Sequence, residues 1–127
     1  MAIAFLIGRI IFGGYFLLNS YNHLVHSGHM VGYAQSKGVP SARLAIVASG
    51  ILLLIGGLSV VLGYCPLIGA IALIVFLVPV TFKMHDFWKI QDPMARMGER
   101  IAFEKNLALI GAALMMLAVS VPWPYSI

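Results

Sequence analysis

Four long apolar stretches constrain this chain more than any other feature of its sequence. They cover about residues 2–22, 44–62, 66–82 and 106–121, and Arg9 is the one Asp, Glu, Lys or Arg residue within them. Each is close to the roughly 17–25 residues that an α-helix needs to cross about 30 Å of hydrocarbon. A backbone in lipid must satisfy its own N–H and C=O groups, and strand-like alternation is absent. The sequence therefore predicts an all-α integral membrane protein.

The composition agrees with a lipid environment. Hydrophobic residues make up 61% of the 127 and charged residues only 9%, against roughly a quarter charged in a soluble domain. The eight Lys and Arg outnumber the four Asp and Glu. They form no dense run, however, so the sequence does not indicate nucleic-acid binding. The length fits one domain, residues 1–127, and the single cysteine, Cys65, excludes an internal disulfide or a CxxC pair.

The connections between the stretches predict the order of the helices. Polar segments at residues 20–43 and 83–105 separate the first stretch from the second and the third from the fourth, and a tight turn at 63–66 joins the middle two. We therefore expect a four-helix bundle with up-down-up-down topology. Glycine pairs at 13–14 and 56–57 favour close packing between helices. The apolar N-terminus lacks a preceding basic region and a clear cleavage site, and is predicted to be a retained span.

The distribution of charge predicts an orientation. Seven of the eight basic residues lie in or beside the first and third connections. The positive-inside rule places those connections in the cytoplasm and both termini on the opposite side. Arg9, near the N-terminal end, is the exception. Trp123 and Tyr125 follow the fourth stretch and are expected at headgroup level.

Arg9 is the most costly residue to place in lipid. A central arginine costs about 2.5–3.5 kcal/mol on insertion scales, and no acidic residue lies within the four stretches. Two interpretations stay open: the side chain reaches the near interface, or it faces the bundle and binds a carbonyl, an anion or a ligand. At about 100° per residue, one helix face collects Arg9, Gly13, Phe16, Ser20 and His23. Such a polar line is expected to point inward and to form one wall of a cavity.

Three histidines follow the first stretch at intervals of three residues: His23, His26 and His29. On a helix, neighbouring members could share a metal or a haem. No cysteine or carboxylate completes a recognisable ligand set, so no metal site is predicted. Ordinary polar loop residues, or a proton-handling role for His23 or His85, remain open.

The ends of the third and fourth stretches hold further polar groups. Residues 83–88 either form an interfacial belt or hold a flat ligand, with Trp88 stacking and His85 or Asp86 exchanging protons. Lys105 and Asn106 open the fourth stretch, where an asparagine can hydrogen-bond between helices. No catalytic residue is predicted. The predicted ligand-binding set is Arg9, Ser20, His23, His85, Asp86, Trp88, Lys105 and Asn106.

Short motifs are distributed along nearly the whole chain. They are Gly8-Arg9, Lys37-Gly38-Val39-Pro40, Gly56-Gly57-Leu58 with Leu62-Gly63, Phe76-Leu77-Val78-Pro79 with Thr81-Phe82, His85-Asp86-Phe87-Trp88, and Lys105-Asn106-Leu107-Ala108-Leu109 with Gly111. In order and spacing they resemble the DoxX family of small bacterial membrane proteins. The resemblance implies a four-helix bundle in the bacterial plasma membrane. It also implies a quinone-related role, because a relative sharing the family's name is a subunit of a thiosulfate:quinone oxidoreductase. Many relatives carry a glutamate where this chain has Leu53.

Two functions remain open from the sequence. The first is an accessory subunit of a membrane oxidoreductase system that binds a quinone-like ligand, whose carbonyls would accept hydrogen bonds from Arg or His. With no flavin or haem-attachment motif and no cysteine pair, the chain would need a partner oxidoreductase subunit or a bound cofactor to move electrons. The second is a non-catalytic membrane scaffold, assembly factor or small-solute carrier. The expected partners are the lipid bilayer, an oxidoreductase subunit and a second copy of the chain.

Overall fold

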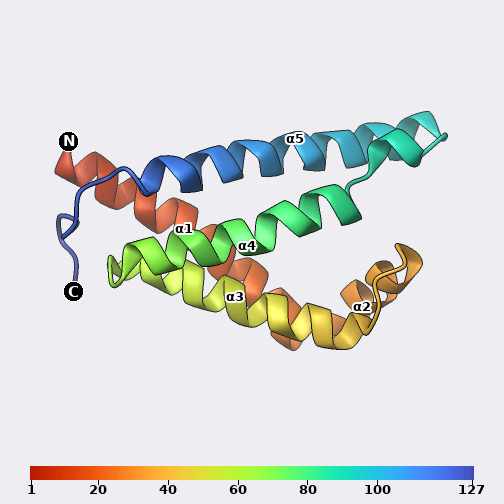
Figure 1. The fold of residues 1–127 in the computed structure, drawn as a ribbon, viewed down its shortest axis with the longest axis horizontal. Coiled ribbons are helices and arrows are strands. Elements are labelled where there is room, and N and C mark those ends of the chain that lie inside the picture. Colours follow the sequence, from red (N-terminus) through yellow and green to blue (C-terminus); the bar gives the residue numbers. More distant parts are fainter.

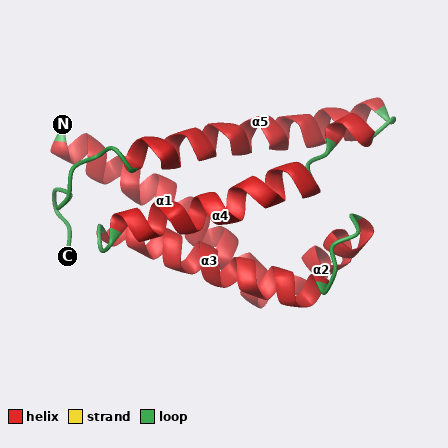
Figure 2. Ribbon diagram, in the orientation of Figure 1, coloured by secondary structure: helices red, strands yellow, loops and turns green.

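Helices account for most of the chain in the computed structural model, which describes residues 1–127 (Figure 2). The elements are α1 (Ala2–Val25), α2 (Ser27–Ser36), α3 (Ala42–Leu62), α4 (Pro66–Met84), the short 3₁₀ helix η1 (Phe87–Lys89) and α5 (Pro93–Met116). The structure contains no strand, so the predicted all-α class is confirmed. Three segments are long and apolar enough to cross a membrane: α1, α3 and Pro66–Lys89, which contains α4.

The long helices run back and forth along one axis. Figure 1 shows α1 and α4 leading away from the end that holds both termini, and α3 and α5 returning to it. Helix α1 packs on α3, α3 on α4 and α4 on α5, while α1 and α5 share no extensive interface. The row of helices is therefore open on the side between its first and last members.

The segment at residues 20–43, predicted to be a polar loop, contains helix α2. The structure thus has five α-helices where the sequence predicted four. Glycine, serine and histidine dominate α2, so its apolar pattern is weak. Its buried Val31 and Ala34 pack on Ala42 of α3, with Val39 and Met84 beside them. Tertiary packing, which overrides weak local propensity, stabilises this short helix.

The last helix also differs from its predicted range of 106–121. Helix α5 begins at Pro93 and ends at Met116, so its N-terminal half crosses the segment predicted to be polar. The Asp92 carboxylate accepts a hydrogen bond from the backbone N–H of Ala95 at 2.9 Å, and proline occupies the first helical turn. An Asp-Pro pair is a typical helix start. The prediction failed because hydropathy identifies only the apolar half of this helix.

Three of the four glycines in the two predicted pairs, Gly13, Gly56 and Gly57, bring neighbouring helices into close contact, whereas Gly14 has no atom within 4 Å of an added Cβ. A Cβ atom added at Gly13 would lie 2.8 Å from the carbonyl oxygen of Gly57, where α1 crosses α3. One added at Gly56 would lie 3.1 Å from the carbonyl oxygen of Gly69, where α3 crosses α4. The absence of side chains at these positions sets the spacing of the three helices.

The inward face of α1 is the one that helical periodicity predicted. The buried residues of this helix are Arg9, Gly13, Phe16, Ser20 and His23. Phe16 belongs to the main core together with Leu53, Val60, Leu73, Leu77 and Trp123. Leu53 is fully buried in this apolar cluster. The inward line on α1 is thereby confirmed.

Candidate ligand-binding site

A cavity of about 530 Å³ lies among the five α-helices. Of its 23 lining residues, 15 are hydrophobic, and they include Phe16, Phe76 and Leu77. Ligand-binding pockets have volumes of roughly 300–1,000 Å³ and are lined mainly by apolar side chains with a few polar groups. The cavity is therefore of the right size and character for an apolar ligand with a polar head.

The polar lining comes from widely separated parts of the sequence. It comprises Asn19, His23, Ser49, Lys83, His85, Lys105 and Asn106, together with the hydroxyl groups of Tyr15 and Tyr33, whose rings are counted among the 15 hydrophobic residues. Four of the eight predicted site residues, namely His23, His85, Lys105 and Asn106, are thus brought together. Sequence reasoning missed Tyr15 and Asn19, although both precede His23 at intervals of four residues and so share its helix face. No carboxylate lines the cavity.

His23 is held by α3. Its Nδ1 lies 2.8 Å from the Ser49 hydroxyl, which itself donates to the carbonyl oxygen of Ile46 at 2.8 Å. Since the serine proton is used in that bond, Nδ1 carries the imidazole proton and donates to Ser49. Nε2 of the neutral ring is then an acceptor with no hydrogen-bond partner within the chain. The ring also packs edge-on against Phe76, with 5.8 Å between centroids.

Lys105 and Asn106 contribute donors from α5. The Lys105 Nζ donates to the Tyr15 hydroxyl at 2.8 Å and lies 5.3 Å from the centre of that ring. Asn106 is only 6% exposed, yet its side-chain amide makes no hydrogen bond within the chain. Because its atoms are not sealed off, the amide faces the cavity that it lines. The donor and acceptor groups of this amide are thus free to bind a molecule in the cavity.

A network of charged and polar groups connects three elements at the end of the cavity far from the termini. Lys37, following α2, lies 2.7 Å from an oxygen of Asp86 and 3.8 Å from one of Glu99 on α5. Glu99 also accepts from the Tyr33 hydroxyl at 2.7 Å and lies 3.3 Å from Nδ1 of His85. Burial, followed by the hydrogen bond to Glu99, raises the pKa of Tyr33, so its hydroxyl remains a donor. The structure therefore places Asp86 in an ion pair and not in the cavity lining.

Arg9 lies in a different part of the molecule. Its guanidinium donates to the carbonyl oxygens of Val61 at 3.1 Å, of Tyr125 at 3.3 Å and of Pro124. Arg9 is 2% exposed and lies over the ring of Trp123, 5.6 Å from its centre. Of the two interpretations that the sequence left open for Arg9, the second is the one observed. The side chain does not reach out to the near interface but faces the bundle, where it binds backbone carbonyls. It fastens the C-terminal tail to α3, and the structure does not bring it to the cavity.

Three residues expected at a site or interface have other surroundings. Trp123, expected at headgroup level, is 2% exposed and packs edge-on against Phe5. The tail folds back onto the helices, and the depth of Trp123 at the headgroups stays a prediction. Ser20 donates to the carbonyl oxygen of Gly50 at 2.8 Å and does not line the cavity. Trp88 is 47% exposed and packs against Phe87 and Phe103 outside it.

The spaced histidines do not assemble into a metal site. The structure brings together no group of three or more His, Cys, Asp and Glu side chains that could hold a metal ion. His23 lies in α1 near its end, and His26 separates α1 from α2. His26 packs against the Tyr21 ring, with 5.3 Å between centroids.

The chain is all-helical, has three segments apolar enough to cross a bilayer, and has an apolar cavity among its helices. It therefore belongs to the class of helical membrane proteins. Comparison with protein families identifies it further. The DoxX family model matches residues 4–86, about two thirds of the chain, and the chain belongs to the DoxX family. Helices α1 to α4 lie within that match, apart from the first two residues of α1, whereas Trp88, Lys105 and Asn106 lie beyond it. Neither a search of curated proteins nor one of solved structures finds a match.

Proposed function

We propose that this DoxX family protein is an accessory subunit of a membrane oxidoreductase system and holds a quinone-like ligand in its cavity. The observation that carries the proposal is an apolar cavity of about 530 Å³ with an unpartnered, buried Asn106 in its wall. A quinone combines an apolar ring and tail with carbonyl acceptors. Asn106 and Lys105 would donate to those carbonyls, and the free Nε2 of His23 would accept from the hydroxyl of the reduced form.

The proposed role requires a partner subunit, because the sequence shows no site of its own for a redox group. Its residues include no flavin or haem-attachment motif and no cysteine pair. Electrons would reach a bound quinone from a separate oxidoreductase subunit. Cross-linking in native membranes that captures such a subunit would support this role. Capture of a second copy alone would favour the non-catalytic scaffold.

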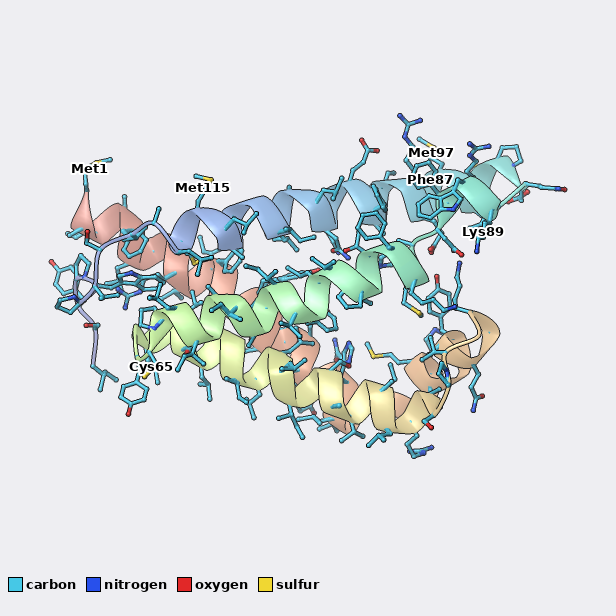
Figure 3. All side chains as sticks on the ribbon, viewed as in Figure 1. Met1, Cys65, Phe87, Lys89, Met97 and Met115 are labelled. Carbon is cyan, nitrogen blue, oxygen red and sulfur yellow. The ribbon has the colours of Figure 1, made fainter.

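We also propose that α5 is a fourth span beside α1, α3 and α4. Its direction fits, because both termini then lie on one side of the bilayer (Figure 1). Figure 3 shows Cys65 at the end that holds Met1, and Phe87 and Lys89 at the other end. The positive-inside rule would place Lys89 in the cytoplasm and Cys65 outside.

The native cysteine tests this topology directly. Cys65 is the only cysteine and is exposed, so a membrane-impermeant maleimide applied to intact cells should label it. A Cys65→Ser, Gln91→Cys variant moves the thiol to the exposed connection before α5 and should be labelled only after lysis. The opposite labelling pattern would invert the orientation, and labelling of both in intact cells would contradict a bundle that spans the membrane.

The ligand is tested by extraction and by titration. Protein purified in a mild non-ionic detergent should retain quinone in its lipid extract, and short-chain ubiquinone or menaquinone should raise its unfolding temperature. Asn106→Leu, which preserves volume but removes the donor, should weaken binding about tenfold, the effect of roughly 1.4 kcal/mol. The matched control is Asn22→Leu, at an exposed position on α1 outside the cavity. Recovery of no quinone and no thermal shift would reject the proposal.

A further inference from the structure

Lys105 is a positive charge without a counterion at the point where the polar half of α5 meets its apolar half. It lies halfway along α5, and its Nζ contacts the Tyr15 hydroxyl, halfway along α1, at 2.8 Å. A tyrosine hydroxyl is neutral, so this bond leaves the charge uncompensated. The ion pairs of the chain involve Lys37, His85 and Arg100, but not Lys105. An ammonium group within a bilayer is costly unless it is paired or reaches the interface.

The acidic residues nearest the cavity cannot supply the missing counterion. Asp86 is bound to Lys37 at 2.7 Å. Glu99 is held by Tyr33 at 2.7 Å and by His85 at 3.3 Å. Neither carboxylate lines the cavity, although Tyr33 and His85 do. Glu104, the neighbour of Lys105 in the sequence, is exposed and lies 3.4 Å from Arg100. The lysines that line the cavity, Lys83 and Lys105, therefore have no carboxylate beside them in the lining, and a bound anion could supply the compensating charge.

Asn106, the residue next to Lys105, provides an independent indication of a ligand. Its side chain is more than nine-tenths buried, has no hydrogen-bond partner in the chain and lines the same cavity. An amide N–H and an ammonium on adjacent residues would together bind an oxygen that carries negative charge, because charge-assisted hydrogen bonds are the stronger kind. The open side between α1 and α5 leaves Lys105 exposed beside this group.

We infer that the occupant of the cavity carries an anionic oxygen head, which Lys105 and Asn106 bind, and an apolar body that lies among Phe16, Phe76 and Leu77. The inference rests on the proposed function and narrows its ligand class. Among quinone-like molecules, a site of this kind should bind those with an ionised ring hydroxyl more tightly than neutral quinones. A fatty-acid carboxylate shares this chemistry, so the two sources must be separated by experiment.

Two matched pairs of probes test the inference in detergent-solubilised protein near pH 7. The first pair is a 2-hydroxy-3-alkyl-1,4-naphthoquinone, which is anionic at this pH, and its neutral 2-methoxy ether. The second is dodecanoate and its methyl ester. We expect the anionic naphthoquinone to bind at least tenfold more tightly than its ether. Lys105→Met retains the apolar stem without the charge and should abolish this preference, whereas Lys89→Met, the same charge change outside the cavity (Figure 3), should retain it.

The possible outcomes distinguish a failure of this inference from a failure of the proposed quinone-binding function on which it rests. Equal affinity for the two naphthoquinones would overturn the anionic preference and leave quinone binding intact. A preference for dodecanoate over its ester, with no binding of either naphthoquinone, would support the anionic site and reject the quinone. Binding of none of the four probes would overturn both. A preference retained in Lys105→Met, with the folded state verified by its unfolding curve, would remove Lys105 from the site.

Discussion

Two adjacent glycines in α1 give a sharp test of the packing that forms the cavity wall. A Cβ atom at Gly13 would meet the carbonyl oxygen of Gly57 at 2.8 Å and the backbone nitrogen of Val61 at 3.2 Å. One at Gly14 would meet no atom within 4 Å. Gly13→Ala and Gly14→Ala therefore add the same methyl group to the same helix, and only the first adds it between α1 and α3.

The magnitude follows from the contact distances. Backbone atoms cannot swing aside, so α1 and α3 would separate by roughly half an ångström to bring the 2.8 Å approach to the 3.4 Å or more of ordinary contact. A gap of that size forfeits about a quarter of the attraction in each neighbouring contact. Overpacking costs typically about 1–3 kcal/mol. Replacing glycine by alanine in a helix gains up to about 1 kcal/mol. This gain is common to both variants, so their difference isolates the steric cost of about 1–3 kcal/mol.

Unfolding in mixed micelles of dodecylmaltoside and SDS, followed by far-ultraviolet circular dichroism, measures this difference. We expect Gly14→Ala to match or exceed the native stability and Gly13→Ala to fall below it. Because α1 carries Tyr15 and His23 on the cavity wall, Gly13→Ala should also weaken quinone binding while Gly14→Ala does not. Equal stabilities within about 0.5 kcal/mol, the usual scatter for neutral substitutions, would refute the close crossing at Gly13.

Other parts of the structure give further expectations. Arg9→Leu should lower the free energy of unfolding by about 1.5–3 kcal/mol, because three hydrogen bonds from a buried charged group to backbone carbonyls are lost. It should leave ligand affinity unchanged, and a loss of affinity in a stably folded variant would place Arg9 in the site. Glu99→Gln, in a side chain only 20% exposed, should cost about 1.5–3 kcal/mol, because a neutral amide with one acceptor oxygen replaces the charged carboxylate that Tyr33 and His85 share. An unchanged unfolding curve would contradict the network. The raised pKa of Tyr33 stabilises the fold fully below the unfolded value of about 10 and progressively less as the pH rises above it. The stability difference between the native protein and Tyr33→Phe should accordingly shrink above pH 10 in alkaline unfolding curves. A constant difference would show that burial of this hydroxyl does not change the stability at alkaline pH.

The course of α1 was determined by the sequence alone. Periodicity predicted that Arg9, Gly13, Phe16, Ser20 and His23 face inward, and these are its buried residues. The helical class and the ranges of α3 and α4 could also be predicted from the lengths of the apolar stretches. These features depend on the geometry of a single helix, which repeats every 3.6 residues whatever surrounds it.

Only the tertiary structure decided what the inward side chains contact. Arg9 was expected to lack a salt-bridge partner because no acid lies within the apolar stretches. Its partners are carbonyls of α3 and of a tail more than a hundred residues away, which the sequence could not identify. Helix α2 exists because Val31 and Ala34 find apolar partners outside it. The cavity likewise combines His23, Lys105 and side chains from all five helices. Hydropathy and periodicity describe neighbours within one helix, whereas these contacts depend on how the helices fold back on one another.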